Sequence, residues 1–296
     1  MICFGAVHWD VIAHATRTIE RETSTPAQLV QKPGGVATNV ARALARLGID
    51  TTLVGAVGAD PAAGAIRSAL AADGVRHWLQ EQPGMATGQY LALHDPDGSL
   101  AAACIDDQVL AAAPSTFFED AAKTAHEDAL WFVDANLPPA VLASLIERAP
   151  AGRVCADAVS VAKVHRLSPI LAKIGLLILN RAEAAELTCA HPDTSSEDLA
   201  SALLAKGPKT VIITGGKAPL HARTKDLQLT LPTPKADIND VTGAGDALIA
   251  GTLAAVARGH DLAASLAAGQ SAARLTLESH GAVSDHLSWQ AVQPSP

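Results

Sequence analysis

Aromatic residues and cysteines are scarce in this chain of 296 residues. Phenylalanine, tryptophan and tyrosine make up only 3% of it, so aliphatic side chains and alanine must fill the core that a hydrophobic content of 49% implies. The four cysteines lie far apart and form no CxxC pair: Cys3, Cys104, Cys155 and Cys189. This spacing argues against a metal cluster or a disulfide framework and fits a reducing compartment.

Long apolar runs and excess positive charge are also missing. No run approaches the ~20 apolar residues that span a bilayer, and the N-terminus has no basic stretch followed by an apolar one. The net charge is -8 and the isoelectric point is about 5.7. Such an acidic chain is a poor partner for nucleic acid or an anionic membrane. We therefore expect a cytoplasmic protein without partners of either kind.

Two common nucleotide-binding motifs are absent. The chain contains no GxxxxGK[ST], and after Gly243 and Gly245 the next glycine is Gly251, so GxGxxG does not occur there. Since no GxGxxG follows the first predicted strand either, a dinucleotide-binding oxidoreductase is the weakest of the functions considered.

Strand-like and helix-like segments alternate along most of the chain. Strands are predicted at 1–7, 51–57, 75–79, 130–134, 153–157, 175–179 and 209–214, with a hairpin across 219–231. Helices are predicted at 36–47 (with Gly48 as C-cap), 61–72, 138–148, 161–173, 181–188, 196–205, 244–257 and 261–277. Such alternation predicts a three-layer α/β/α fold, in which helices cover both faces of a mainly parallel central sheet.

Two segments interrupt the alternation. Residues 11–33 are polar and irregular, and residues 87–106 form two strand-like runs around the strong turn sequence Asp-Pro-Asp-Gly at 95–98. We expect these segments to form a small β lid over the ligand-binding edge of the sheet. No linker or internal repeat divides the chain, which indicates a single domain over residues 1–296.

The stretch DVTGAGDALIAG, from Asp240 to Gly251, joins small residues to an apolar run typical of a buried helix. The small residues are Gly243, Ala244 and Gly245. They can turn tightly and direct several backbone N–H groups at one point, to which the helix adds its own free N–H groups and positive dipole end. This arrangement suits a phosphate or the charge that develops during its transfer. Asp246, just inside the helix, would be a base beside this anion cradle, although a tight turn with an N-terminal helix charge explains the segment about as well.

Further polar residues follow other predicted strands. Asp10 comes after the first strand, at the edge where open α/β sheets bind ligands. Gly34 and Gly35 would let the backbone approach a ligand, and the Asn39 amide can bond to sugar hydroxyls. Alternatively, Gly34, Gly35 and Asn39 simply form a loop and the start of a helix. Asn136 also follows a strand and faces the same edge, while Lys163 is either a phosphate or substrate contact or a surface lysine.

The sequence NRAE places Asn180 and Glu183 on one face of a first helical turn, directly after a strand. An amide and a carboxylate there suit a magnesium ion that keeps most of its waters and touches substrate phosphates. They also form a capping pair, and the two interpretations are compatible. Thr214 and Gly216 follow the strand TVIIT and could contact a nucleotide phosphate, though a plain turn explains them equally well.

Taken together, these motifs resemble those of the PfkB/ribokinase family of carbohydrate kinases. GGVATNVARALARLG is similar to the family's N-terminal signature, DVTGAGDALIAG to its C-terminal signature, and NRAE to the element between them. The order, spacing and βα pattern match over nearly the whole chain. YLALHDPDGSL, DANLP and DAVSVAK are most similar to pseudouridine kinases of this family.

The resemblance implies a role for each matching residue. Asp246 would take the proton from a 5′-hydroxyl, while Gly243, Ala244 and Gly245 form the anion hole. The substrate would be held by Asp10, Gly34, Gly35, Asn39, Asn136 and Lys163. ATP and Mg²⁺ would be held by Asn180, Glu183 (through water), Thr214 and Gly216. A monovalent cation such as K⁺ would lie at Asp240 and Thr242. The family also implies a homodimer formed through the lid strands.

The resemblance is incomplete at four positions, and it leaves rivals open. Thr38, Ala158, Pro219 and Leu248 replace residues common in the family (arginine, proline, glycine and phenylalanine). They put the substrate assignment in doubt but not the reaction class. The alternatives are a ribokinase-like sugar kinase, another nucleoside kinase, and a catalytically silent nucleoside sensor.

Overall fold

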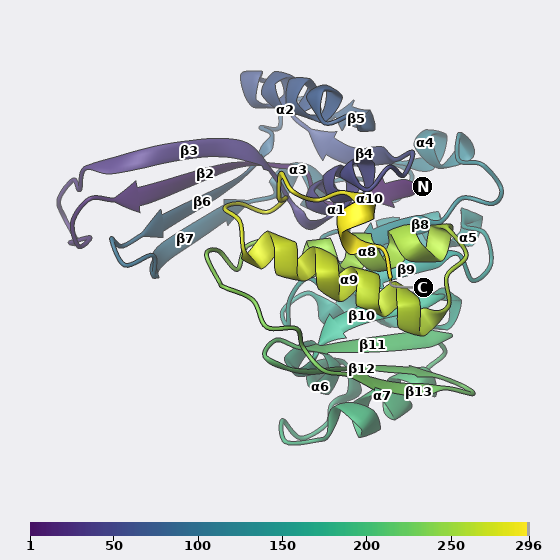
Figure 1. The fold of residues 1–296 in the computed structure, drawn as a ribbon. Coiled ribbons are helices and arrows are strands. Elements are labelled where there is room, and N and C mark those ends of the chain that lie inside the picture. Colours follow the sequence, from purple (N-terminus) through teal and green to yellow (C-terminus); the bar gives the residue numbers. More distant parts are fainter. Residues whose placement is uncertain (295–296) are drawn as a thin grey trace.

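The computed structural model describes residues 1–294 and contains two β-sheets flanked by helices (Figure 1). The large sheet has nine strands in the order β13-β12-β11-β10-β9-β8-β1-β4-β5. These strands are β1 (Ile2–Phe4), β4 (Thr52–Val57), β5 (Arg76–Glu81), β8 (Trp131–Asp134), β9 (Val154–Asp157), β10 (Leu176–Asn180), β11 (Thr210–Gly215), β12 (Ala218–Thr224) and β13 (Gln228–Leu231). All neighbours pair in parallel except β11 with β12 and β12 with β13.

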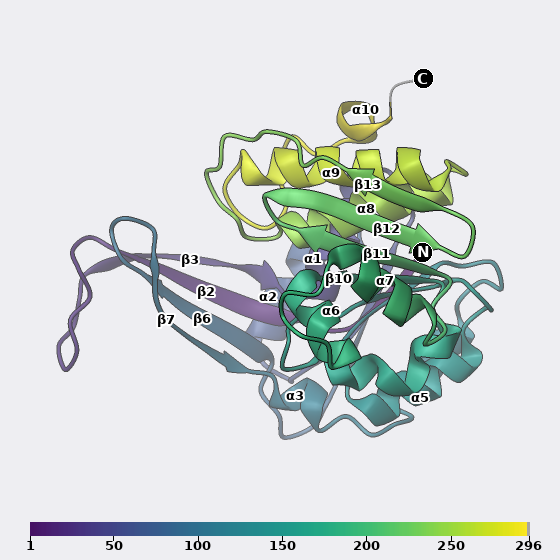
Figure 2. The same cartoon turned by 90° about the horizontal axis from the view of Figure 1, so that it is seen from below.

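Helices cover both faces of the large sheet (Figure 2). One face carries α1 (Val36–Arg46), α2 (Pro61–Ala72), α8 (Ala244–Ala257), α9 (Leu262–Leu277) and α10 (Trp289–Val292). The other carries α3 (Gln108–Ala111), α4 (Glu119–Lys123), α5 (Pro139–Arg148), the 3-10 helix η1 (Val164–Lys173), α6 (Arg181–Thr188) and α7 (Ser196–Leu204). Strand side chains alternate between the two cores, so Ile2 and Phe4 pack on one side and Cys3 on the other. The predicted three-layer fold with a mainly parallel sheet is confirmed.

The small sheet contains β2 (His8–Ala15), β3 (Ala27–Gly34), β6 (Gly88–His94) and β7 (Leu100–Asp106), in the order β3-β2-β6-β7. It projects from the helical layers as an arm (Figures 1 and 2). Within the segment 11–33, which looks irregular in the sequence, residues 11–15 and 27–33 lie in the regular strands β2 and β3. The partner of β2 on its other side is the distant strand β6, a pairing that no local pattern reveals. His8 and Asp10 accordingly lie in a strand rather than beyond one.

Smaller differences concern helices. The segment predicted as a helix over 161–173 forms a 3-10 helix that contains Pro169, and the short helices α3, α4 and α10 were not predicted. Gly48 has φ +75, as expected for a glycine that ends a helix, although Leu47 is the capping residue itself. Within residues 1–294 none of the helices has the length and apolar character required to traverse a bilayer.

Candidate active site

The carboxyl ends of four parallel strands bring polar residues together at one edge of the large sheet. Strands β8 and β9 end side by side at Asp134 and Asp157, and β10 and β11 place Asn180 beside Thr214. The N-termini of helices α1 and α8 reach the same edge, as the contacts described below show. This edge is therefore the candidate site.

Asp134 connects several backbone segments at this edge of the sheet. Its buried carboxylate accepts hydrogen bonds from the backbone N–H groups of Ala6 (3.0 Å), Ala37 (3.0 Å) and Asn136 (2.9 Å). These bonds join the turn after β1 to the first turn of α1. Burial raises the pKa of this carboxyl, against the hydrogen bonds that lower it. A β-carbon at Gly5 would overlap Asp134, which explains a glycine there.

Asp246 and Asn39 meet across the site from helices α8 and α1. The Asn39 Nδ2 donates to Asp246 Oδ2 at 2.8 Å, although 207 positions separate the two residues in the sequence. Burial raises the pKa of the Asp246 carboxyl to about 7; the Asn39 bond opposes the shift, and the charges of Asp134 and Asp10 add to it. A carboxyl with a pKa near neutrality is suited to accept a proton under physiological conditions.

The turn before α8 can be built only with glycine at its first position. Gly243 caps the helix with φ +76, and a β-carbon there would overlap the backbone of Ala282. A β-carbon on Gly245 would meet no atom within 4 Å, so this residue borders open space. Helix α8 is 14 residues long, so its N-terminus presents free N–H groups and a full dipole end to that space.

Asp240 fastens the loop that leads into this turn. Its carboxylate accepts from the backbone N–H groups of Thr242 (2.8 Å) and Gly281 (2.9 Å). Partial burial opposes the effect, but these bonds and the charge of Lys32 lower the pKa of Asp240, which is therefore ionised. Asp240 and Thr242 are thus joined directly, in a loop clamped to the segment after α9.

Asp10 lies against the glycine pair that precedes α1. A β-carbon at Gly34 would overlap the Asp10 carboxyl, and Gly35 has φ +96 and would overlap Ala6. Burial raises the pKa of Asp10 to about 6, and the charge of Lys32 opposes this shift. The Oδ1 atoms of Asp10 and Asn39 are both buried and have no hydrogen-bond partner. Because unpartnered buried oxygens are costly, these two favour a site completed by a polar ligand.

Asn136 and Lys163 contact each other at a further part of the site. Lys163 Nζ donates to Asn136 Oδ1 at 2.7 Å and pairs with Asp107 Oδ2 at 3.1 Å. Arg166 donates to the Asn136 backbone oxygen at 2.7 Å and fixes the turn. Sequence reasoning missed both residues, because Asp107 follows a strand of the small sheet rather than of the large one and Arg166 lies within η1.

Asn180 and Glu183 form the predicted capping box. The Asn180 side chain accepts from the Glu183 N–H at 2.9 Å, and Glu183 Oε2 accepts from the Asn180 N–H at 2.7 Å. Glu183 is only 5% exposed, and burial raises its pKa. Burial and the charges of Asp246 and Glu183 raise the pKa of Asp157 well above its usual range. Asp157 thus lies close enough to Asp246 and Glu183 for their charges to act on it.

Thr214 and Gly216 lie at the next strand end, where β11 bulges and the chain reverses into β12. Gly216 has φ +61, and a β-carbon on it would meet nothing within 4 Å. Its carbonyl accepts from the Thr233 hydroxyl at 3.2 Å. No hydrogen bond joins Thr214 or Gly216 to Asp246 or Asn39. Pro219 lies within β12, so this reversal is a tight hairpin.

The remaining departures from the family pattern have structural roles. Thr38 is fully buried and donates its hydroxyl to the Ala6 carbonyl at 3.0 Å. Ala158 and Leu248 are buried in the two cores. Lys32 supplies a nearby positive charge from strand β3 that sequence reasoning did not identify.

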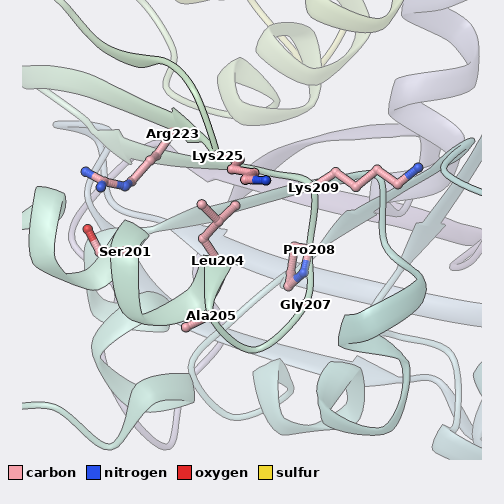
Figure 3. A pocket seen from close by; sticks show the side chains of 8 residues that line it. All are labelled: Ser201, Leu204, Ala205, Gly207, Pro208, Lys209, Arg223 and Lys225. Carbon is pink, nitrogen blue, oxygen red and sulfur yellow. The ribbon is translucent and has the colours of Figure 1, made fainter.

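A hollow of about 500 Å³ lies at the opposite edge of the sheet (Figure 3). Lys209, Arg223 and Lys225 line it at the start of β11 and the end of β12. Arg223 is engaged by Gln228 Oε1 at 2.6 Å, and both lysines are exposed. The hollow shares no residue with the candidate site.

Comparison with known proteins assigns the chain to a family. The model of the pfkB family carbohydrate kinases matches residues 1–289, almost the whole described chain. The chain belongs to the PfkB family. It is therefore a kinase that transfers phosphate to an alcohol group, as the motifs predicted.

Several PfkB relatives are similar over most of this chain. Pseudouridine kinase from Arabidopsis thaliana is 27% identical over 94% of this chain and 90% of its own length; that from Escherichia coli K12 is 26% identical over 85% and 82%. The bifunctional protein HldE from Caulobacter vibrioides is 31% identical over 88% of this chain and 57% of its own length.

Solved structures show the same ribokinase-like fold. A carbohydrate kinase from Agrobacterium tumefaciens superposes with a TM-score of 0.86 and 27% identity, covering 99% of this chain and 97% of that one. A putative ribokinase II from E. coli in complex with ATP and Mg²⁺ has a TM-score of 0.84 and 16% identity, covering 98% and 96%.

Proposed function

We propose that this PfkB protein phosphorylates the 5′-hydroxyl of pseudouridine with ATP, giving pseudouridine 5′-phosphate and ADP. One observation carries the kinase mechanism: the Asp246 carboxyl, with its pKa raised to about 7, adjoins the glycine turn at the N-terminus of α8. The names of the Arabidopsis and E. coli relatives support the choice of substrate. In this proposal the enzyme is cytoplasmic and consists of one domain, and the small sheet is its lid.

In this proposal Asp246 removes the proton from the 5′-hydroxyl as the oxygen attacks the γ-phosphorus of ATP. Backbone N–H groups of residues 243–245, at the N-terminus of α8, stabilise the charge that develops on the transferring phosphoryl group. Asn39 orients the Asp246 carboxylate, the catalytic base, through its 2.8 Å hydrogen bond. Phosphoryl transfer requires mainly positioning and charge neutralisation, which these groups provide.

The substrate contacts extend from the reacting end outwards. The unpartnered oxygens of Asp10 and Asn39 accept ribose hydroxyl protons, and Gly34 and Gly35 let the backbone approach the sugar. Asn136 and Lys163, which contact each other, hold a further part of the substrate. Thr214 and Gly216 border ATP.

The side chains at this edge of the sheet fit a magnesium ion only if they bind it through its water molecules. In residues 1–294 no three His, Cys, Asp or Glu side chains are grouped so that they could hold a metal. Glu183 keeps one carboxylate oxygen free of the capping box, and with Asn180 it would bind waters of a magnesium ion carried by the ATP phosphates. The ion would neutralise phosphate charge. The ionised Asp240, with Thr242, would bind a monovalent cation such as K⁺ beside the anion hole.

The base assignment predicts how turnover depends on pH. Asp246 accepts a proton only when it is ionised, so kcat should fall about tenfold for each pH unit below its pKa of about 7 and level off above it. A pH series from acid to mildly basic buffer, at saturating ATP and nucleoside, measures this dependence. A kcat that stays level as the pH falls through 7 to 5 would contradict the assignment.

A substrate panel tests the choice of nucleoside. With ATP and Mg²⁺ we expect kcat/KM to be highest for pseudouridine and at least tenfold lower for uridine, adenosine and ribose. The rival is a sugar kinase or another nucleoside kinase of the family. A clear preference for ribose or adenosine would support that rival, and ATP consumption that no substrate stimulates would favour a sensor.

We also propose that the enzyme is a homodimer formed through its small sheets. The projecting sheet exposes Leu29 (64%) and Leu91 (40%) on one face, and Val30 and Ile105 on the other. Apolar side chains grouped on a protruding surface are typical of an interface. A monomeric mass in solution at micromolar concentration would contradict this assembly.

A further inference from the structure

His8 stands out among the buried polar residues, because nothing in the proposed mechanism uses it. Its side chain is only 6% exposed, and its Nε2 is buried without a hydrogen-bond partner. Such an atom in a folded protein calls for an explanation. Burial lowers the pKa of His8 to about 4, so the ring is neutral and offers one donor and one acceptor nitrogen.

The position of His8 places it in the substrate site. His8 and Asp10 are two residues apart in β2, so their side chains share one face of the small sheet. Their neighbours on β3 and β6 in this register include Gly34 and Gly88, and a β-carbon at Gly88 would overlap the His8 ring. Glycines on both flanking strands thus leave the room that the two polar side chains occupy.

His8 also adjoins the Asn136–Lys163–Asp107 group. The charges of both Asp107 and Lys163 act on its ring. Lys163 is fixed by Asn136 at 2.7 Å and by Asp107 at 3.1 Å, so the group is a built arrangement rather than a set of mobile surface charges. The charge of Asp10 acts on Asp246, and His8 lies two residues from Asp10 on the same face of β2, which leaves His8 for the part of the substrate beyond the sugar.

For the proposed function to be specific, the part of the site that holds the base must distinguish pseudouridine from uridine. When the two sugars are superposed, the rings differ at one edge position, where pseudouridine carries the N1–H group and uridine carries a C–H group. Only a hydrogen-bond acceptor can tell these apart, and a neutral imidazole nitrogen is such an acceptor.

We propose that His8 Nε2 accepts a hydrogen bond from the N1–H of pseudouridine and is the residue that selects this nucleoside over uridine. This inference rests on the proposed pseudouridine kinase activity. Asp107 and Lys163 hold the neighbouring polar edge of the base, and His8 reads the one group that differs. His8 is thus a specificity residue and takes no part in proton transfer at the 5′-hydroxyl.

The test compares His8→Phe, which keeps a ring of similar size, with His8→Gln, which keeps an amide near the position of Nε2. For His8→Phe we expect kcat/KM with pseudouridine to fall about tenfold, the value of one hydrogen bond, while kcat/KM with uridine changes less than about twofold. His8→Gln should recover part of the preference. The KM for ATP should not change in either variant.

A substrate analogue makes the test independent of how the variants fold. In the unsubstituted protein, N1-methylpseudouridine, which lacks the N–H, should bind at least tenfold more weakly than pseudouridine by calorimetry. Equal losses for pseudouridine and uridine in His8→Phe, or an unchanged preference, would overturn the role of His8 alone. If the unsubstituted protein phosphorylates neither nucleoside, the proposed function fails, and this inference fails with it.

Discussion

An Asp246→Asn protein should bind ATP as tightly as the unsubstituted protein and turn over about a thousandfold more slowly. The asparagine oxygen can still accept the 2.8 Å hydrogen bond from Asn39, so the geometry of the site is kept while the base is lost. Steady-state kcat with saturating substrates and calorimetric titration with ATP measure the two effects. A kcat within threefold of the unsubstituted protein would exclude Asp246 as the base.

The stability of this variant separates chemistry from misfolding. Burial raises the pKa of Asp246 in the folded protein above its unfolded value of 3.8, so ionisation of this carboxyl weakens the fold as the pH rises from about 4 through about 7. Asparagine removes that cost. The melting temperature of Asp246→Asn should therefore exceed that of the unsubstituted protein at pH 8 and differ less at pH 5. A lower melting temperature at pH 8 would show that the loss of turnover has a structural cause.

Alanine at Gly243 and at Gly245 should have different effects on stability and similar effects on activity. An alanine at position 243 would have to adopt φ +76, and its methyl would overlap the Ala282 backbone. We therefore expect a destabilisation of roughly 3 kcal/mol. At Gly245 the methyl meets no protein atom, and alanine is the better helix former, so stability should stay the same or rise. Both variants should lose about a hundredfold in kcat/KM, because each methyl disturbs the cradle for the phosphoryl group.

Gly245→Ala is the more informative of the pair, since a stable but inactive protein identifies the open space beside it as the place of the phosphoryl group. Denaturant unfolding and kcat/KM with ATP as the varied substrate measure the two effects. Full activity in Gly245→Ala would contradict the anion hole. Gly64→Ala provides a matched control, because that glycine likewise lies within a helix, α2, with no positive φ and with open space where the methyl would go.

The sequence was most informative where a single element carries the signal. The run of small residues at 243–245 before an apolar segment predicted the glycine turn and helix α8, and NRAE predicted the capping box of Asn180 and Glu183, because turn and cap chemistry is local. The alternation of strands and helices predicted the three layers for the same reason. The family assignment from these motifs is confirmed by the match over residues 1–289.

Contacts between distant segments could not be predicted in this way. The pairing of β2 with β6 depends on two segments far apart in the chain, and the polar alternation of residues 8–15 looks irregular without its partner. Asp107 and Lys32 have no local signal, because only the fold brings them to Lys163 and to Asp10. The unpartnered nitrogen of His8 becomes visible only in three dimensions.

The most direct test of the account is to identify the product formed from pseudouridine, ATP and Mg²⁺ by mass spectrometry with fragmentation. We predict one added phosphate, on the 5′-oxygen of the ribose, with an equal amount of ADP, and no product in the Asp246→Asn protein. A phosphate on another hydroxyl, or equal product formation by Asp246→Asn, would contradict the site at the N-terminus of α8.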